Sequence, residues 1–327
     1  MLRLLTNFER FPAQWRSTSG VTGTTAVAKT FGEFLRLGRS ADFIIINCDS
    51  GLTYQLAAAY WLLPFLRRPV VSNDLVLRKP KNWRSRITAW IKRALLSRID
   101  HFTLHFRMLE GYQKYFGIGS DRASYVPFKS NIRGRYQYQV SSDGDYIFCF
   151  GRSERDYDTF FAAVATLPYP VAILQPNFEW FRANGSRFTW PLDKLPPNVR
   201  ILPDEGTDEY LVQVIEKAKL VVLPILASRI APSGISTYLS SMLMGKCVIL
   251  TEGPAASDIF TEEVILVPPE DPEALAEAIR RAWEDDDLRH RTAEAGRRYS
   301  ESCGGEEELQ QRVLDQAIEH LHLSERR

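Results

Sequence analysis

Apolar and polar residues alternate along the first part of the chain in blocks that predict strands followed by helices. The run DFIIIN at residues 42–47 is continuously apolar and β-branched, which is typical of a strand buried on both faces of a parallel sheet. Further strands are expected at residues 2–5, 69–73, 101–105 and 124–128. Helices are expected at residues 26–37, 52–66, 82–97 and 108–117, and the Gly/Ser/Thr-rich segment before the first of them is expected to be a loop. This alternation predicts a doubly wound α/β domain.

The same alternation restarts after a polar, aperiodic segment at residues 129–143, which we interpret as a linker. Strands are expected at residues 146–150, 171–175, 199–202, 220–224 and 248–250. Helices are expected at residues 159–167, 209–217, 236–244 and 272–285, with a long terminal helix from about residue 306. A length of 327 residues is enough for two domains of roughly 150 residues each, so two α/β domains are predicted.

Charge divides at the same place as the pattern. The formal net charge is only +1, from 41 Lys and Arg against 40 Asp and Glu. Residues 1–138 carry 22 basic and 8 acidic residues (22 − 8 = +14), whereas residues 139–327 carry 19 and 32 (19 − 32 = −13). A basic half joined to an acidic half indicates that the first half meets an anionic partner.

The cysteines and the apolar segments indicate a compartment. Three of the four cysteines, Cys48, Cys149 and Cys247, lie in apolar β-like runs, and no C-x-x-C spacing occurs. The first residues lack the long apolar core of a signal peptide, and the longest apolar stretch, residues 56–66, is too short to span a bilayer. We expect a reduced, cytoplasmic protein that does not cross a membrane.

Residues 220–254 hold the most informative motif. They read as a buried strand, a loop containing Pro232, Ser233 and Gly234, a helix that begins near Ser236, and a second strand. A helix N-terminus preceded by Ser-Gly presents unpaired backbone N–H groups and the positive end of the helix dipole, which together favour an anion. The segment is equally consistent with a capped helix that binds nothing.

This segment resembles the C-terminal domain of GT-B glycosyltransferases, the large retaining family that uses nucleotide-sugar donors. The matching pieces occur in the family's order: CFGRSERDYDTFFAA (149–163), NVRILPDEGTDEYLVQVIEKAKLVVLP (198–224), SGISTYLSSMLMGKCVI (233–249) and VPPEDPEALAEAIRRAWEDDDLR (267–289). The resemblance covers most of residues 145–300 and is looser over residues 1–138. It implies two Rossmann-like domains: an acceptor-binding domain at 1–138, a nucleotide-sugar-binding domain at 139–305, and a helix at 306–327 that crosses back to the first domain.

The resemblance also implies the donor site. A UDP- or GDP-sugar is the expected substrate, and no other cofactor is expected. The implied donor-binding residues are Gly151, Arg152, Arg155, Ser233, Gly234, Ile235, Ser236 and Ser240, with Gly20 in the loop 19–25 offering backbone N–H groups from the first domain.

Two departures from the family's pattern affect the expected activity. The family has two glutamates eight residues apart, and the matching positions here hold Pro232 and Ser240. A serine hydroxyl can bond a ribose hydroxyl but cannot replace a carboxylate that accepts from two of them. Either the chain is a divergent active transferase, which we favour, or it is a non-catalytic binding subunit with the same fold.

Transfer of the sugar releases a nucleotide diphosphate that carries about two negative charges. Arg152, Arg155 and the helix N-terminus at 234–236 would stabilise it without a metal. The segments DYD at 156–158 and DDD at 285–287 read as helix ends, so no metal site is expected.

Three residues of the first half are candidates for acceptor binding or catalysis. Asp49 and Asp74 each follow a predicted strand, at the carboxyl end where α/β folds bind ligands, and His105 ends the strand at 101–105. Asp49 is also a suitable N-cap for the following helix, and the histidine is equally consistent with a structural role.

The predicted helix at 82–97 is the second strong signal. From Arg78 to Arg98 there are eight cations, and no acidic residue lies between Asp74 and Asp100. Trp83, Ile87, Trp90 and Ile91 recur at helical spacing. This composition is typical of a helix in an anionic membrane interface. We therefore expect peripheral association with the inner face of the plasma membrane and a glycan or lipid-linked acceptor. An ordinary core helix and a nucleic-acid-binding helix are the alternatives, and nucleic acid is the less favoured partner.

Overall fold

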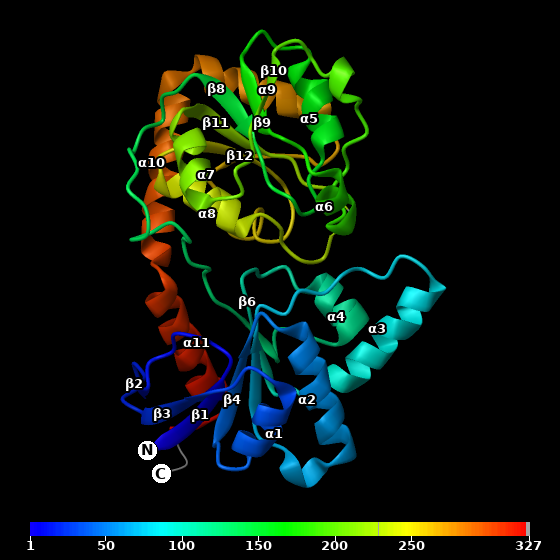
Figure 1. Ribbon diagram of the computed structural model, residues 1–327, viewed down its shortest axis with the longest axis vertical. Helices are drawn as coiled ribbons and strands as arrows, with labels where there is room; N and C mark the ends of the chain where they lie inside the picture. The colour runs from blue at the N-terminus through cyan, green and yellow to red at the C-terminus, as the bar shows by residue number, and fades with distance from the viewer. Residues whose placement is uncertain (228, 325–327) are drawn as a thin grey trace. The chain divides into compact units, whose positions relative to one another are not determined.

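The computed structural model describes residues 1–227 and 229–324, which form two compact units. Unit 1 contains Met1–Pro127 together with Glu307–Arg327, and unit 2 contains Phe128–Glu306. Residues 325–327 of the predicted terminal segment lie outside the described part. Each unit is built on a sheet with parallel strands, so the predicted α/β class is confirmed (Figure 1).

The sheet of unit 1 has the strand order β2-β3-β1-β4-β5-β6-β7 and is parallel except for the pair β2 and β3. Its strands are β1 (Leu2–Thr6), β2 (Gln14–Arg16), β3 (Thr22–Val27), β4 (Phe43–Asn47), β5 (Val70–Asn73), β6 (His101–Leu104) and β7 (Ala123–Tyr125). β1 pairs with β3 on one side and with β4 on the other, so the direction in which strands are added to the sheet reverses at β1. The crevice where ligands bind in such sheets therefore lies beyond the carboxyl ends of β1 and β4.

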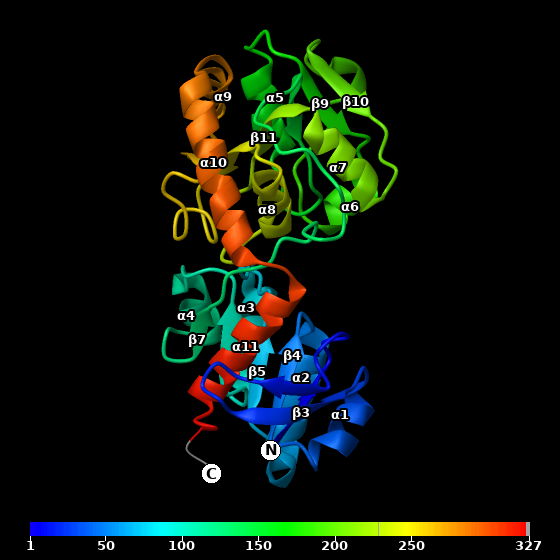
Figure 2. The ribbon, with the colours of Figure 1, turned by 90° about the vertical axis from the view of Figure 1, so that its left-hand side faces the viewer.

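Unit 1 carries helices on both faces of this sheet, with α11 on the opposite side from α1 and α2 (Figure 1). They are α1 (Phe31–Gly38), α2 (Ser50–Leu62), the short 3-10 helix η1 (Pro64–Leu66), α3 (Trp83–Leu96), α4 (Glu110–Phe116) and α11 (Glu306–His320). In Figure 2, α11 runs along the side of unit 1 that faces the viewer.

The expected loop at residues 16–25 and helix at residues 26–37 are only partly right. β2 and β3 form an antiparallel hairpin in which residues 17–21 are the connecting turn, β3 takes the second half of the expected loop, and the helix begins only at Phe31. Gly23 makes this hairpin possible, because a Cβ there would lie 2.1 Å from the ring of Trp15, which is buried against Phe43. This packing joins residues that are distant in sequence, so the local pattern does not reveal it.

The sheet of unit 2 is fully parallel, in the order β10-β9-β8-β11-β12-β13. Its strands are β8 (Tyr146–Cys149), β9 (Val171–Leu174), β10 (Val199–Leu202), β11 (Ala218–Leu223), β12 (Cys247–Thr251) and β13 (Ile265–Val267). Numbered within the unit this is the order 3-2-1-4-5-6 of dinucleotide-binding sheets, whose switch point lies between the first and fourth strands. The crevice of unit 2 therefore lies beyond β8 and β11.

The helices of unit 2 include some that the sequence pattern predicted and others that it missed. They are α5 (Tyr157–Val164), α6 (Phe178–Ala183), η2 (Leu192–Lys194), α7 (Asp208–Glu216), α8 (Ile235–Leu243), α9 (Pro272–Glu284) and α10 (Asp286–Cys303). The sequence did not predict α6, α10 or β13. α10 was missed because Asp285 ends α9 and caps α10 at once, accepting from the N–H of Leu288, so two helices meet without a turn signal.

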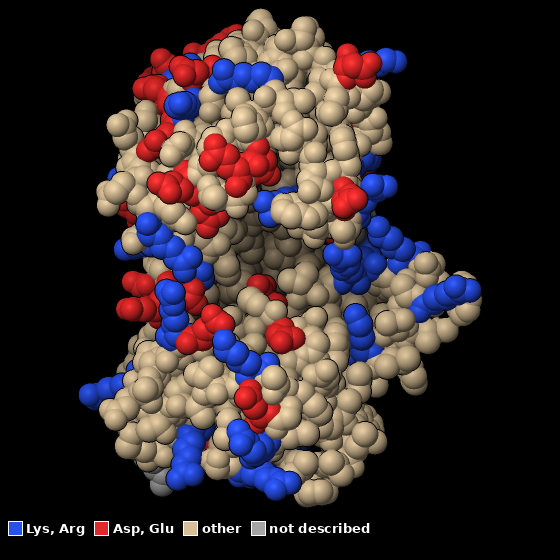
Figure 3. Space-filling model, in the orientation of Figure 1, with Lys and Arg blue, Asp and Glu red and all other residues tan. Residues whose placement is uncertain are grey.

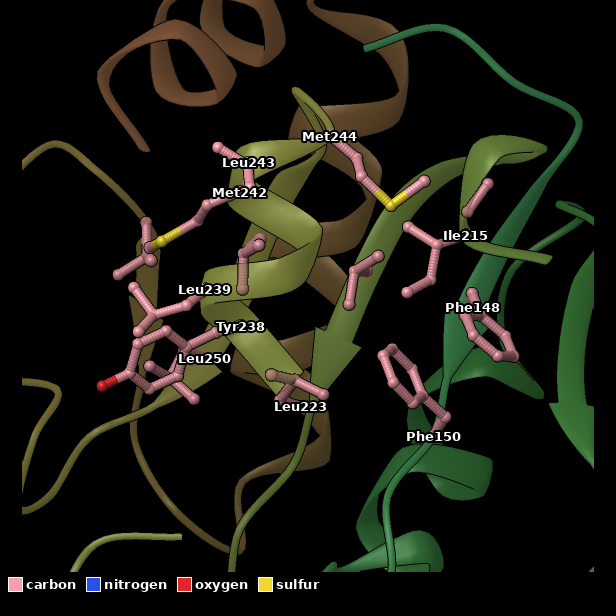
Figure 4. Packing of buried hydrophobic residues seen from close by; sticks show 14 of the residues in the cluster. Phe148, Phe150, Ile215, Leu223, Tyr238, Leu239, Met242, Leu243, Met244 and Leu250 are labelled. Atoms are coloured by element: carbon pink, nitrogen blue, oxygen red, sulfur yellow. The ribbon is translucent and has the colours of Figure 1, made fainter. Parts of the chain in front are cut away.

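The core of unit 2 has two parts, one on each face of the sheet. Phe148 and Val221 point to one side, toward α7 and α8, whereas Cys149 and Val222 point to the other, toward α5 and α9. This alternation is what a strand covered on both faces requires. Figure 4 shows the first part, with Leu223 below the helix α8 and Phe150 at the lower right.

The segment predicted as a linker belongs to unit 2. Ile132 is buried in the core beside α7 and α8, and Tyr136 and Tyr138 pack against the same cluster. The division between the units therefore falls at Pro127, before this segment. The segment is mostly polar, but these few apolar and aromatic side chains are enough to pack it on unit 2.

Candidate active site

Two loops meet at the switch point of unit 2. The first follows β8 and contains Gly151, and the second follows β11 and leads through Gly234 into α8. Both glycines have positive φ angles, 113° and 82°, and lie against the guanidinium of Arg155. A Cβ would lie 2.4 Å from Nη2 of Arg155 at Gly151 and 2.7 Å from it at Gly234. These glycines are needed for both their backbone conformation and their lack of a side chain.

The structure changes the expected role of Arg155. Its side chain is only 1% exposed, and it donates from Nε to the carbonyl of Phe150 and from Nη1 to the carbonyl of Ser153. Weaker bonds run to Oγ of Ser233 and Oγ1 of Thr237, both at 3.3 Å. Burial lowers the pKa of this guanidinium. Arg155 is thus buried between the two loops and joins them, and it is not a group that faces a ligand.

The N-terminus of α8 remains available. Gly234 occupies the N-cap position with no side chain to accept from the first turn, so the N–H groups that begin at Ile235 are not capped by a side chain. Ser233 is turned away, donating to the carbonyl of Ser153, and Ser236 accepts from the amide of Asn131. This is a site where backbone N–H groups and the helix dipole favour an anion.

A pocket of about 260 Å³ adjoins this helix end. It is lined by residues that follow the carboxyl ends of three neighbouring strands, β8, β9 and β10, and by Thr237 from the first turn of α8. The polar and aromatic groups that line it include Arg152, Gln175, Asn177, Trp180, Asp204 and Asp208.

Arg152 forms the cationic rim of this pocket. It is exposed, and its guanidinium lies over the indole of Trp180 with 4.0 Å between the guanidinium carbon and the ring centre. Stacking of this kind fixes the plane of the guanidinium while leaving its N–H groups free to bond an anion. Arg152 is thus the predicted cation that the structure places in contact with solvent at the pocket.

Ser240 does not reach the pocket. It lies on α8 one turn beyond Thr237 and is buried, and it is absent from the pocket lining. The predicted contact of Ser240 with a ligand is therefore not supported by its position. Pro232 lies in the loop before α8 and offers no hydrogen-bond donor.

Asparagines and a strained backbone mark the switch point of unit 1. Asn7, after β1, donates from its amide to the carbonyl of Asn47 and accepts from the N–H of Asn47, which ends β4. Cys48 and Asp74 follow β4 and β5 with φ angles of 50° and 53°, and the thiol of Cys48 donates to Oδ2 of Asp74 over 3.4 Å. Positive φ angles at non-glycine residues are uncommon and gather at functional sites.

The other candidates in unit 1 have structural partners. Asp49 is the N-cap of α2, where it accepts from the N–H of Leu52. His105 is buried, and its Nδ1 bonds the carbonyl of Val126, which can only accept, so Nδ1 carries the proton. The strand ends bring Asp49, Asp74 and His105 to one edge of the sheet, and Asp74 is the one without a capping role or full burial.

Gly20 does not join these residues. It lies in the turn between β2 and β3 with a φ of 84°, just before the strand position at which Gly23 pairs with Leu2. That is the amino end of the parallel strands, at the opposite edge of the sheet from Asp49 and Asp74. The expectation that Gly20 lies in a ligand-facing loop is wrong, since the turn that holds it lies at the amino end of the parallel strands.

The sequence reasoning missed the pocket residues Asn177 and Trp180. They belong to α6, which has only six residues and so shows no helical period. A signal was present: Asn177 caps the helix by accepting from the N–H of Trp180, and Gly185, with a φ of 75°, follows its end. Asparagine before and glycine after a short aromatic run is a helix signature.

The acidic segments DYD (156–158) and DDD (285–287) lie at helix N-termini, as the sequence predicts. Asp156 accepts from the N–H of Thr159 at the start of α5, and Asp285 caps α10. Within residues 1–227 and 229–324, no group of three or more His, Cys, Asp or Glu side chains is arranged to hold a metal ion.

Part of this chain is similar in sequence to a known protein family. Residues 193–299 match the family described as glycosyl transferases group 1. No curated protein sequence matches the chain significantly.

Solved structures are similar over nearly the whole chain. Sucrose-phosphate synthase from Thermosynechococcus elongatus superposes with a TM-score of 0.63 at 16% identity, covering 99% of this chain and 89% of the synthase. HepE from Anabaena, in complex with UDP and glucose, gives 0.64 at 15% identity, covering 92% and 85%. α,α-Trehalose 6-phosphate synthase from Burkholderia multivorans gives 0.60 at 13% identity, covering 97% and 89%. At these identities the likeness shows a shared fold.

Proposed function

We propose that this chain, a GT-B glycosyltransferase whose residues 193–299 belong to the glycosyl transferases group 1 family, transfers a sugar from a UDP- or GDP-sugar to a glycan or lipid-linked acceptor. The observation that carries the donor side is the pocket beyond β8, β9 and β10, which is lined both by Arg152 and by Thr237 from the first turn of α8, whose N-terminus has no side-chain cap. HepE binds UDP-glucose in its own structure, and we extend that class of donor to this chain.

The pocket supplies groups suited to a nucleoside. Trp180 and Tyr210 offer aromatic surface, and Gln175 and Asn177 offer amides that can bond a base edge. Asp204 and Asp208 line the same pocket, and we propose that one of them accepts from the ribose hydroxyls. This replaces the carboxylate that the family's pattern would put at position 240.

The diphosphate is held by positive groups of the chain itself. As the bond between the anomeric carbon and the phosphate oxygen breaks, negative charge grows on the leaving nucleotide. The guanidinium of Arg152 and the N–H groups at the start of α8 would stabilise that charge, which is why we propose transfer without a metal. Retention of configuration is proposed because the resemblance is to a retaining family.

On the acceptor side we propose that Asp74 bonds the acceptor hydroxyl. Its position beyond β5, its positive φ and its contact with Cys48 distinguish it from Asp49, whose carboxylate caps α2. A reduced cytoplasmic location is part of the proposal, because three of the four cysteines are buried in the core. We also propose a role in polysaccharide biosynthesis, the use that fits a glycan acceptor.

Calorimetric titration of the purified chain with UDP, GDP and their glucose and mannose conjugates tests the donor site. We expect one of the two nucleotides to bind and the matching sugar nucleotide to be slowly hydrolysed without acceptor. Binding with no turnover of any conjugate, tested with glycan and lipid-linked acceptors, would favour the non-catalytic subunit that the positions Pro232 and Ser240 suggest. Absence of binding to every nucleotide would overturn the proposal.

A further inference from the structure

Helix α3 presents its large apolar side chains to solvent. Trp83 is 66% exposed, Trp90 71%, Ile87 51% and Ile91 48%. An ordinary surface helix buries such a stripe against its own domain. The alternative that this stripe is part of the domain core is therefore wrong.

The helix instead packs on its own domain through two buried apolar residues and one lysine. Ala89 and Leu96 are its buried residues, and Lys92 lies over the ring of Tyr54 on α2. At about 100° per residue, the buried pair lies on the side of the helix opposite to the Trp and Ile stripe. The stripe therefore points away from unit 1.

Cations border the stripe on both sides. By the same spacing, Arg84 lies roughly 80° to one side of its centre and Arg86 roughly 80° to the other. Arg78, Lys79 and Lys81 precede the helix, and no acidic residue occurs from Leu75 to Ile99. In Figure 3 the projecting end of α3 shows blue and tan atoms and no red.

A second group of exposed apolar side chains lies where α2 ends. Leu62 is 80% exposed and Phe65, in η1, is 75% exposed. The indole of Trp61 donates to the carbonyl of Ala94, so this group adjoins the last turns of α3. The apolar surface thus continues from α3 onto its neighbour.

We propose that α3 docks unit 1 on an anionic lipid bilayer, with Trp83, Ile87, Trp90 and Ile91 in the interface and Arg84 and Arg86 on the lipid phosphates. Two tryptophans at the centre of an apolar stripe with arginines at its borders match the depth profile of a bilayer interface. Nucleic acid would be met by cations at the centre of the surface, and here they lie at its edges. Of the described helices, none is both long and apolar enough to cross a bilayer.

Vesicle co-sedimentation of the full chain tests this proposal and needs no sugar donor. We expect binding to vesicles of phosphatidylcholine with 30% phosphatidylglycerol, at least ten-fold weaker binding to phosphatidylcholine alone, and weakening as salt is raised. The double variant W83S/W90S should bind the anionic vesicles at least ten-fold more weakly, and R84E/R86E should do the same. V140S is the matched control: Val140 is 55% exposed in unit 2, and its loss should leave binding unchanged.

The substituted side chains are exposed, so the far-ultraviolet circular dichroism and melting temperature of each variant should equal those of the unchanged protein. Equal vesicle binding by W83S/W90S and the parent, or no binding to anionic vesicles, would overturn the proposal. So would a parent dimer that W83S/W90S dissociates, or an oligonucleotide affinity that exceeds the vesicle affinity. These outcomes would assign the surface to a second copy or to nucleic acid.

Discussion

The guanidinium of Arg155 lies directly against the Cα of Gly234, so close that a Cβ there would lie 2.7 Å from Nη2. One residue from the loop after β8 thereby sets the position of the N-terminus of α8, which follows β11. Arg155 therefore fixes the two loops of the switch point relative to each other. The geometry of the proposed anion site depends on its contact with Gly234.

Gly234→Ala should damage both the fold and nucleotide binding. The added Cβ is strained at a φ of 82° and displaces Arg155. We expect the free energy of unfolding to fall by about 2–4 kcal/mol and nucleotide affinity to fall at least ten-fold.

Gly134→Ala is the control for backbone strain alone. Gly134 has a φ of 70° with open space around it, so this change should cost about 1 kcal/mol and leave nucleotide affinity unchanged. Urea unfolding and calorimetry measure both quantities. Equal effects of the two variants would contradict a special role for the contact with Arg155.

Substitution of Arg152 should mainly lower nucleotide affinity, whereas substitution of Arg155 should mainly lower stability. Arg152→Ala removes an exposed cation stacked on Trp180, so we expect at least a ten-fold loss of nucleotide diphosphate affinity with a stability change below about 1 kcal/mol. Arg155→Met leaves the carbonyls of Phe150 and Ser153 without their donor, and unfolding free energy should fall by about 2–4 kcal/mol. Calorimetry and denaturant unfolding distinguish them. Unchanged affinity in Arg152→Ala would remove Arg152 from the donor site.

Asp74 and Asp49 can be separated in the same manner. Asp74→Asn keeps a residue that tolerates positive φ but removes the charge, and we expect turnover to fall at least ten-fold with donor affinity unchanged. Asp49→Ala removes the N-cap of α2 and should cost about 1 kcal/mol of stability, with turnover at saturating substrate unchanged. Steady-state kinetics of both variants, beside their unfolding curves, check this. A larger loss of turnover in Asp49→Ala would reverse the assignment.

The stability of unit 1 should fall in mild acid because of His101. Its ring stacks on His320 of α11 with 3.8 Å between ring centres, and burial, with the charges of His320 and Arg122 nearby, lowers its pKa from 6.5 to about 3. Between pH 6.5 and 3 the unfolded chain therefore binds a proton that the folded chain does not. The stability associated with a neutral His101 is complete above pH 6.5 and is lost as the pH falls toward 3. At pH 5 the free energy of unfolding should be lower by about 1–2 kcal/mol.

His101→Gln removes that titration. Urea unfolding at pH 7 and pH 5 should show a smaller loss of stability for the variant than for the parent. An identical loss in both would mean that His101 does not set the acid sensitivity.

The order of strands and helices was predictable from the sequence because apolar runs and their spacing are local properties. The strand at 42–47, the helix at 82–97 and the separation of charge between the two halves all follow from neighbouring residues. The resemblance to GT-B enzymes added the prediction that the loops after β8 and β11 bind the donor. Both loops lie at the switch point of unit 2. Even the exposed stripe of α3 was visible as a pattern, although not the direction in which it points.

Only the tertiary structure decided which of these residues face a ligand. Arg152 and Arg155 are three positions apart and chemically alike, yet one is exposed on Trp180 and the other is buried under two glycines. The β2-β3 hairpin, and with it the place of Gly20, depends on Trp15 covering Gly23. Burial and contact between distant segments are properties of the packed chain, so the sequence determined the elements and their chemistry, and packing determined which side chains the site can use.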